Sequence, residues 1–139
     1  MIEVTCAIIE YNSKVLVAQR SEKMALPLKW EFPGGKIEKG ETAEACLIRE
    51  ILEELHINIK ITKQLNTNSH QYSETKTIKL IPFICELIDG EIKLTEHANF
   101  LWLSKSELSN LDWADADVPI LNEYLNIEND RGYIRANNK

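Results

Sequence analysis

Residues Gly35–Ile57 carry the most specific information in the chain and read GKIEKGETAEACLIREILEELHI. From Thr42 to Leu55 the composition predicts a helix. On that helix Glu50, Glu53 and Glu54 are spaced i, i+3 and i+4, so their side chains share one face. Apolar residues are expected on the opposite face, packed against a sheet, namely Ala45, Ile48, Ile51, Leu52 and Leu55.

The acidic face of this helix has local costs. Arg49 is the only basic residue between Thr42 and Asn58, so the usual pairing of acids with bases one turn apart is lacking. Glu53 and Glu54 also stand in the last turn, where the helix dipole disfavours negative charge. A solvated acidic stripe is the ordinary interpretation, but several penalties at one place favour a functional role. Divalent cations such as Mg²⁺ prefer carboxylate oxygens and would reverse these costs.

The segment resembles the Nudix box, G-x5-E-x7-R-E-U-x-E-E-x-G-U, where U is aliphatic. Its fixed positions are occupied here by Gly35, Glu41, Arg49, Glu50, Ile51, Glu53, Glu54 and Ile57. The second glycine of the box is replaced by His56. That position is expected to end the helix in a left-handed conformation, which histidine enters more readily than most residues. The replacement is therefore expected to cost stability, on the order of 1 kcal/mol, rather than chemistry.

The resemblance extends beyond the box to the MutT branch of the family. Residues 30–38, WEFPGGKIE, are similar to the segment that enters the box in that branch. Residues 112–119, DWADADVP, are similar to the start of its last helix. The likeness implies an α+β Nudix fold, a mixed β-sheet sandwiched between helices. It predicts a Nudix hydrolase domain at 1–127 and a polar C-terminal tail at 128–139 that frays.

The rest of the chain alternates between short apolar segments and turns. Asn12-Ser13 is expected to join two strands in a hairpin, and Asp89-Gly90 to join another pair. Ser104 and Glu107 have the spacing of a capping box for a short helix at about 105–111. A last helix is expected at about 116–127, with Pro119 in its first turn. The expected strands lie at 3–11, 14–20, 30–32, 57–65, 77–88, 91–95 and 100–103.

Length, charge and cysteine content limit the classes of function. The 139 residues suit one domain, and 44% are hydrophobic, which is enough for one core. The formal charge of −6 argues against binding to duplex nucleic acid. The first residues do not resemble a signal peptide, and no apolar run is long enough to cross a membrane. Three cysteines without a CxxC pair suit the reducing cytoplasm. The sequence leaves open a monomer or a homodimer.

The resemblance implies a Mg²⁺-dependent hydrolase, with Mn²⁺ as a possible substitute. Its substrate is expected to be a nucleoside or deoxynucleoside triphosphate, split into a monophosphate and pyrophosphate. Removal of 8-oxo-dGTP from the nucleotide pool is the favoured activity, and CTP or dCTP hydrolysis is the alternative. ADP-ribose, dinucleoside polyphosphates and NADH are further Nudix substrates. A non-catalytic nucleotide-sensing domain is disfavoured because every glutamate of the box is present.

Roles carried over from the family fall on the phosphate end of the site. The resemblance implies that Glu50, Glu53 and Glu54 bind the metal together with the main-chain carbonyl of Gly34. Arg49 is expected to orient a neighbouring acid, Glu41, through paired hydrogen bonds. Glu96, six residues before Trp102 as in the MutT pattern, is the candidate base or further metal ligand. The alternatives are a plain surface arginine at 49 and a plain surface glutamate at 96.

Four other residues are candidates for binding substrate. Arg20 and Lys36 could bind phosphates, although Lys36 could equally be solvated at a turn. Phe32 resembles the residue that packs beside the base, or it is only a core aromatic. Asp117 aligns with an asparagine that reads 8-oxoguanine, and an ionised aspartate accepts hydrogen bonds from the N7–H of 8-oxoguanine or the amino group of cytosine. The alternative is that Asp117, or the neighbouring Asp115, caps the last helix.

Overall fold

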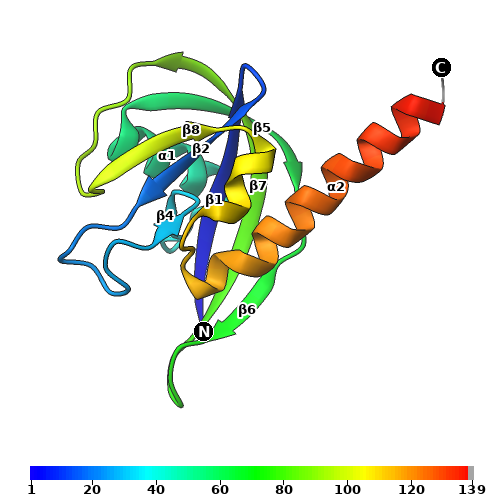
Figure 1. Ribbon diagram of the computed structural model, residues 1–139. Coiled ribbons are helices and arrows are strands. Elements are labelled where there is room, and N and C mark those ends of the chain that lie inside the picture. The colour runs from blue at the N-terminus through cyan, green and yellow to red at the C-terminus, as the bar shows by residue number, and fades with distance from the viewer. Residues whose placement is uncertain (138–139) are drawn as a thin grey trace.

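The computed structural model describes the backbone of residues 1–137 and the side chains of residues 1–127. In chain order the elements are β1 (Ile2–Tyr11), β2 (Lys14–Gln19), β3 (Trp30–Glu31), β4 (Gly34–Lys36), α1 (Ala43–Leu55), β5 (Ile57–Gln64), β6 (Asn68–Gln71), β7 (Thr77–Gly90), β8 (Asn99–Leu103), the 3₁₀ turns η1 (Lys105–Asn110) and η2 (Asp115–Asp117), and α2 (Val118–Asn137). The predicted α+β architecture, a mixed sheet with helices on both sides, is confirmed (Figure 1).

All described strands belong to one eight-stranded sheet built around β1 and β7. The main path runs β3-β2-β1-β7-β5, while β4, β6 and β8 pair with β1, β7 and β2. The β1 and β7 strands are parallel, with Ile2 opposite Ile78 and Glu10 opposite Glu86, and the other strand pairs are antiparallel. The β1–β2 hairpin turns at Asn12-Ser13 as predicted. The sheet is therefore mixed because of its central pair.

Alternation along β1 divides the core between the two faces of the sheet. Ala7 and Ile9 are fully buried on the face that α1 covers. Cys6 and Ile8 are buried on the other face, against the beginning of α2 and the turns before it. Successive side chains of a strand point to opposite faces, so one strand contributes to both layers. The helices α1 and α2 consequently lie on opposite sides of the sheet (Figure 1).

Both ends of α1 are capped, and the cap at His56 is the one that the sequence predicts. The Thr42 hydroxyl accepts the N–H of Ala45 at 3.1 Å, which satisfies one of the free amides of the first turn. At the other end His56 has φ 62° and ψ 30°, the predicted left-handed conformation. Its N–H donates to the carbonyl of Leu52 at 3.0 Å. The residue that departs from the Nudix box therefore still ends the helix where the glycine would.

The predicted apolar face of α1 was partly wrong. Ile51 and Leu55 are fully buried against the sheet, with Cys46 and Leu47 beside them. The structure instead exposes Ala45, Ile48 and Leu52, the last two to 40% and 45%. The helix is rotated so that its buried stripe follows Leu47, Ile51 and Leu55 at steps of four residues. As a result Glu50 and Glu54 lie beside the buried stripe rather than opposite it.

The predicted hairpin turn at Asp89-Gly90 and the strand at 91–95 were also wrong, because Asp89 and Gly90 belong to β7 and the segment after them closes the end of α1 instead. The N–H of Lys93 donates to the carbonyl of Leu55 at 3.0 Å, and the N–H of Thr95 donates to that of Glu54 at 3.3 Å. Helix ends leave carbonyls without helical partners, and these amides satisfy two of them. Two short strands, β4 and β6, escaped prediction because three or four residues carry almost no periodic signal.

The C-terminal elements begin close to where they were expected. The capping box at Ser104 and Glu107 is confirmed, although the segment that follows is a 3₁₀ turn rather than an α-helix. Pro119 is in the first turn of α2, as predicted. The helix continues to Asn137, past the expected end at residue 127. Residues 138–139 of the predicted tail lie outside the described residues. None of the described helices is long and apolar enough to span a membrane.

Candidate active site

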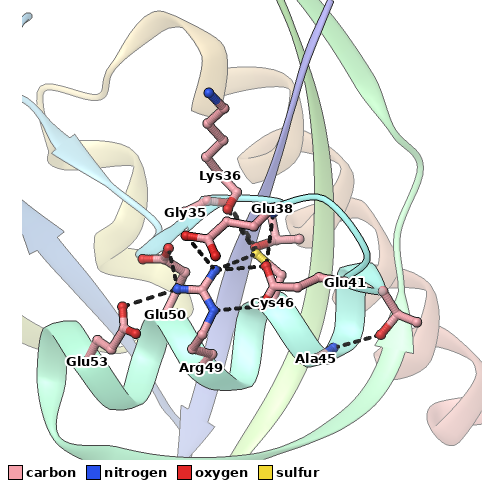
Figure 2. A network of polar contacts seen from close by, with 11 residues as sticks. Gly35, Lys36, Glu38, Glu41, Ala45, Cys46, Arg49, Glu50 and Glu53 are labelled. Carbon is pink, nitrogen blue, oxygen red and sulfur yellow. Dashed lines mark hydrogen bonds and ion pairs between the residues drawn. The ribbon is translucent and has the colours of Figure 1, made fainter.

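The Arg49 guanidinium is the centre of a polar network on α1 (Figure 2). Its Nε and Nη2 donate to the two carboxylate oxygens of Glu41 at 2.6 and 2.8 Å, the paired geometry predicted from the sequence. These bonds, together with the N–H of Glu38, lower the pKa of Glu41 to about 2. Hydrogen bonds to Glu41 and Glu50 in turn raise the pKa of Arg49. Arg49 and Glu41 therefore stay ionised as a pair at and around neutral pH.

Arg49 also contacts two of the three glutamates proposed as metal ligands. Its Nη1 lies 3.0 Å from Glu50 Oε1 and 3.2 Å from Glu53 Oε2. The acidic face is thus less uncompensated than its sequence indicated, because one arginine reaches both carboxylates. Glu54 has no lysine or arginine partner among the described residues, although its side chain is only 17% exposed. The unfavourable charge is therefore concentrated at Glu54.

Burial and neighbouring acids together disfavour the charged form of Glu54. Burial, followed by hydrogen bonding with Glu50 and the charges of Glu50, Glu31 and Glu96, raises the pKa of Glu54 to about 9. These acids come from separate parts of the chain, β3, α1 and the loop after β7. A carboxylate in a crowded, poorly solvated group of acids favours any cation that can approach it.

The donors of this cluster suit a hard divalent cation. Carboxylate oxygens are the ligands that Mg²⁺ and Mn²⁺ prefer, and the repulsion at Glu54 would be relieved by positive charge. Among the described residues, no three acidic, histidine or cysteine side chains converge closely enough to enclose an ion. Glu50 and Glu53 point to Arg49 instead. Metal binding would therefore require these two carboxylates to turn away from the guanidinium.

Two glycines bring the acidic helix up to a cleft on the sheet. A Cβ atom on Gly35 would lie 2.2 Å from the carboxyl carbon of Glu50, and one on Gly34 would lie 2.0 Å from the Thr5 carbonyl oxygen. Only glycine permits approaches this close. Both glycines line the cleft, whose volume is about 480 Å³. The carboxylate of Glu50 thus lies against a glycine that lines the cleft.

Phe32 and Asp117 lie in the same cleft, as the sequence interpretation requires. Phe32 is buried and packs against Trp113, with ring centroids 4.7 Å apart. Asp117 Oδ2 accepts the N–H of Phe32 at 2.8 Å. This bond joins the turn before α2 to the strand segment that leads into the Nudix box. The cleft therefore extends from a buried carboxyl group at Asp117 to the glycines beside Glu50.

The surroundings of Asp117 disfavour the ionised form. Burial, opposed by the Phe32 N–H and Arg20 and supported by the charge of Glu31, raises the pKa of Asp117 to about 8. The raised pKa favours the protonated form at neutral pH. A neutral carboxylic acid donates one hydrogen bond and still accepts others. Asp117 can present a donor and an acceptor side by side, which an ionised aspartate cannot.

The structure brings some of the remaining predicted residues to the site and leaves one away from it. Arg20 lines the cleft, but its Nη1 bonds to Glu31 at 2.7 Å and its Nε to the Ala25 carbonyl at 2.6 Å. Lys36 is exposed, and Figure 2 shows its side chain pointing away from the Arg49 network. Glu96 is exposed in the loop after β7, close enough to Glu54 for its charge to act there. Arg20 and Glu96 are thus brought to the site, whereas Lys36 is not.

Sequence reasoning missed four residues around the site. Glu31 and Tyr72 line the cleft beside Asp117, and Lys76 lies on the loop between β6 and β7. His97 is buried between Glu31 and Glu54. Glu31 stood inside the segment similar to the MutT branch and could have been suspected as an acid next to a core aromatic. Tyr72, Lys76 and His97 come from loops and short strands whose placement depends on the fold.

Comparisons with known proteins identify relatives of this chain. A model of the NUDIX domain matches residues 1–124. A CTP pyrophosphohydrolase of Escherichia coli is 34% identical over 125 residues, covering 90% of this chain and 92% of that protein. A putative 8-oxo-dGTP diphosphatase 2 of Mycobacterium tuberculosis is 35% identical over 103 residues, covering 74% and 73%.

Solved structures show the same fold. The E. coli ORF135 protein superposes with a TM-score of 0.80 at 32% identity, covering 92% of this chain and 91% of that one. The MutT protein of methicillin-resistant Staphylococcus aureus 252 superposes with a TM-score of 0.73 at 46% identity, covering 90% and 95%.

Proposed function

The chain belongs to the Nudix hydrolase family, and from that premise we propose that it is a Mg²⁺-dependent nucleoside triphosphate pyrophosphohydrolase with 8-oxo-dGTP as its preferred substrate. The products are a nucleoside monophosphate and pyrophosphate. The observation that carries the proposal is the cleft of about 480 Å³, which is lined both by Asp117 and by Gly35, the glycine that lies against the Glu50 carboxylate of α1.

The phosphate end of the site is assigned to the acidic helix. Glu50, Glu53 and Glu54 would hold Mg²⁺, or Mn²⁺ in its place, with the main-chain carbonyl of Gly34. When bound, the ion supplies positive charge for the triphosphate and lowers the pKa of an attacking water. The residues of the chain position the carboxylates and line the path to the cleft. Gly35 contributes by lacking a side chain where Glu50 must fit.

Arg49, Glu41 and Glu96 have supporting roles in this proposal. Arg49 is held by Glu41 in a two-bond pair, so its remaining nitrogen is directed at Glu50 and Glu53. Arg49 would bridge those two carboxylates until the cation takes its place. Glu96 is assigned as the base or a further ligand because its charge reaches Glu54 from the facing loop. Arg20, which lines the cleft, is the candidate to contact phosphate.

The surroundings of Asp117 support 8-oxoguanine as the base of the substrate. Unlike guanine, 8-oxoguanine carries hydrogen on N7, next to the acceptor O6. A neutral Asp117 can accept from that N7–H and donate to O6, a pair of contacts that matches the amide of the aligned asparagine. The burial that raises the pKa of Asp117 to about 8 makes this form available at neutral pH. Phe32 lies beside the base in this arrangement.

Hydrolysis of CTP or dCTP is the second candidate. The relative named CTP pyrophosphohydrolase covers 90% of this chain, more than the M. tuberculosis relative named for 8-oxo-dGTP covers. The amino group of cytosine can also donate to Asp117, whether or not the carboxyl group is ionised. The two candidates differ in whether the carboxyl group must donate.

A panel of nucleotides tests the proposal. Wild-type protein is assayed in Mg²⁺ with 8-oxo-dGTP, dGTP, CTP and dCTP, and pyrophosphate is measured separately from phosphate. The proposal predicts release of pyrophosphate that stops when EDTA is added, and the highest kcat/KM for 8-oxo-dGTP. A higher kcat/KM for CTP or dCTP would establish the second candidate. Hydrolysis of none of the four would contradict both.

The same proposal includes an expected compartment and an expected class of partner. All three cysteines are buried and unpaired, which suits a protein of the reducing cytoplasm. The net charge of −6 suits a small nucleotide brought with its cation rather than duplex nucleic acid.

A further inference from the structure

His97 lies in a loop yet is almost completely enclosed. Its side chain is 2% exposed, whereas its chain neighbours Glu96 and Ala98 are exposed. The ring stands between two carboxylates from different elements, Glu31 of β3 and Glu54 of α1. A loop residue buried between two acids of the site is placed there by the fold rather than by local structure.

The two ring nitrogens have unequal contacts. Nε2 lies 2.8 Å from Glu31 Oε2, an ordinary hydrogen-bond distance. Nδ1 lies 3.6 Å from Glu54 Oε2, which is too long for a hydrogen bond. Among the side chains that the structure describes, Nδ1 of His97 is the buried polar atom left without a hydrogen-bond partner. Buried polar atoms are nearly always paired, so this one requires an explanation.

Glu31 connects His97 to the cleft. Its other oxygen, Oε1, accepts from Arg20 Nη1 at 2.7 Å, and both residues line the cleft. A series of polar side chains therefore leads from the cleft to the acidic helix, namely Arg20, Glu31, His97 and Glu54, with hydrogen bonds at the first two steps and a 3.6 Å separation at the last. An apolar residue at position 97 would fill the space without an unpaired nitrogen. The histidine is better explained by its second nitrogen facing Glu54.

We propose that His97 is a positioning residue whose Nε2 is fixed by Glu31 and whose Nδ1 holds the carboxylate of Glu54 in the orientation that binds the cation. A shift of Glu54 by less than 1 Å would turn the 3.6 Å separation into a hydrogen bond in which Nδ1–H donates to the carboxylate, with both ring nitrogens carrying hydrogen. The inference rests on the proposed function, because it takes Glu54 as a metal ligand. Groups that orient ligands in this way commonly change metal affinity or activity by about 10- to 100-fold when they are removed.

Two conservative substitutions separate the contacts of the ring. The amide nitrogen of His97→Gln takes the place of Nε2 and keeps the bond to Glu31, but leaves nothing facing Glu54. The amide nitrogen of His97→Asn takes the place of Nδ1 and keeps the group facing Glu54. We expect His97→Gln to lower kcat about 10- to 100-fold with little change in KM. His97→Asn should stay within about threefold of wild type.

A second measurement does not depend on turnover. Binding of Mn²⁺ alone, followed by electron paramagnetic resonance, should weaken about 10-fold or more in His97→Gln and much less in His97→Asn. His56→Gln is the matched control, because His56 Nδ1 contacts the Lys93 carbonyl outside the cleft. It should leave kcat and Mn²⁺ affinity unchanged. Thermal unfolding of each variant establishes that it is folded.

The outcomes distinguish this inference from the proposed function. Wild-type kcat and Mn²⁺ affinity in His97→Gln would overturn the positioning role. Equal losses in the two variants, in step with a lower Tm, would show that His97 only packs the loop and would overturn it as well. A wild-type protein that binds Mn²⁺ but hydrolyses no nucleotide would refute the proposed function, while the Mn²⁺ affinities would still decide on His97. A wild-type protein that binds no Mn²⁺ would refute both.

Discussion

At the scale of single residues, the site is built around carboxyl groups whose surroundings disfavour charge. Burial is the main cause that raises the pKa of Glu54 to about 9 and that of Asp117 to about 8. Glu41 shows the contrary case, with a pKa of about 2 because Arg49 bonds both of its oxygens. Perturbed carboxyl groups in a cleft are typical of functional sites. Their substitutions therefore separate stability from activity.

Glu54→Gln should lose roughly 100-fold or more in kcat and yet fold at least as stably as the wild type. The raised pKa means that the folded state binds a proton more tightly than the unfolded state between about pH 4.5 and 9. Ionisation of Glu54 therefore costs stability as the pH rises through that window, and glutamine removes the cost. Urea unfolding and turnover in Mg²⁺ check the two parts.

Glu53→Gln is the companion variant. Glu53 is 60% exposed and contacts Arg49 one helical turn away, so its stability should change by only a few tenths of a kcal/mol. Its activity should fall as in Glu54→Gln. Turnover near the wild-type rate in either variant would remove that residue from the proposed ligands.

Asp117→Asn should flatten the dependence of stability on pH. The folded-state pKa of about 8 lies above the ordinary value of 3.8 for an aspartate, so wild-type stability is lost as the pH rises from about 4 to about 8. The wild type and the variant share the other ionisable groups that line this cleft, namely Glu31, Arg20, Tyr72 and Cys6. The fall in Tm across this window should be smaller in the variant. An identical fall would mean that Asp117 is already ionised in the folded protein.

At the scale of elements, α1 shows how a helix can present acids and still pack. Its buried stripe is narrow, following Leu47, Ile51 and Leu55, and leaves Glu50 and Glu54 at the margin of the sheet. The loop from Lys93 to Thr95 covers the last carbonyls of the helix and carries the chain on to Glu96 and His97. The end of α1 therefore holds this loop by hydrogen bonds and also forms one side of the site.

The left-handed conformation at the end of α1 gives a prediction about stability. His56→Gly should be more stable than His56→Ala by about 1 kcal/mol, because alanine keeps the strain of φ near 62° and glycine does not. Both variants lose the contact between the ring and the Lys93 carbonyl. Comparison of the two by chemical denaturation isolates the backbone effect. Equal stabilities would mean that the loop, rather than the residue at 56, fixes this conformation.

Activity in the same pair tests whether His56 has any part in the chemistry. The ring is exposed and contacts a main-chain carbonyl, so both variants should keep kcat within a few-fold of the wild type. A large loss of Mg²⁺ affinity in both would show instead that His56 is a ligand.

At the scale of the whole molecule, the sequence predicts what depends on local pattern. The Nudix box predicted the helix, its left-handed end at His56 and the pairing of Arg49 with Glu41, because these features lie within one short segment. The rotation of α1 was missed, since Ile48 and Leu52 have the same character as the buried residues. His97 and Tyr72 were missed because only the sheet brings their loops to the cleft. The protonation of Asp117 depends on burial, which no local pattern reports.

The central claim is that one cleft binds the base at Asp117 and places the phosphates beside the acidic face of α1. The most direct test is kcat/KM for Asp117→Ala across 8-oxo-dGTP, dGTP, CTP and dCTP in Mg²⁺. Loss of one or two buried hydrogen bonds should lower the value for the best nucleotide by about 1–3 kcal/mol, roughly 5- to 150-fold. Poor nucleotides should lose much less, because they lack that contact. Equal losses for all four nucleotides would contradict the account and leave Asp117 as a purely structural link to Phe32.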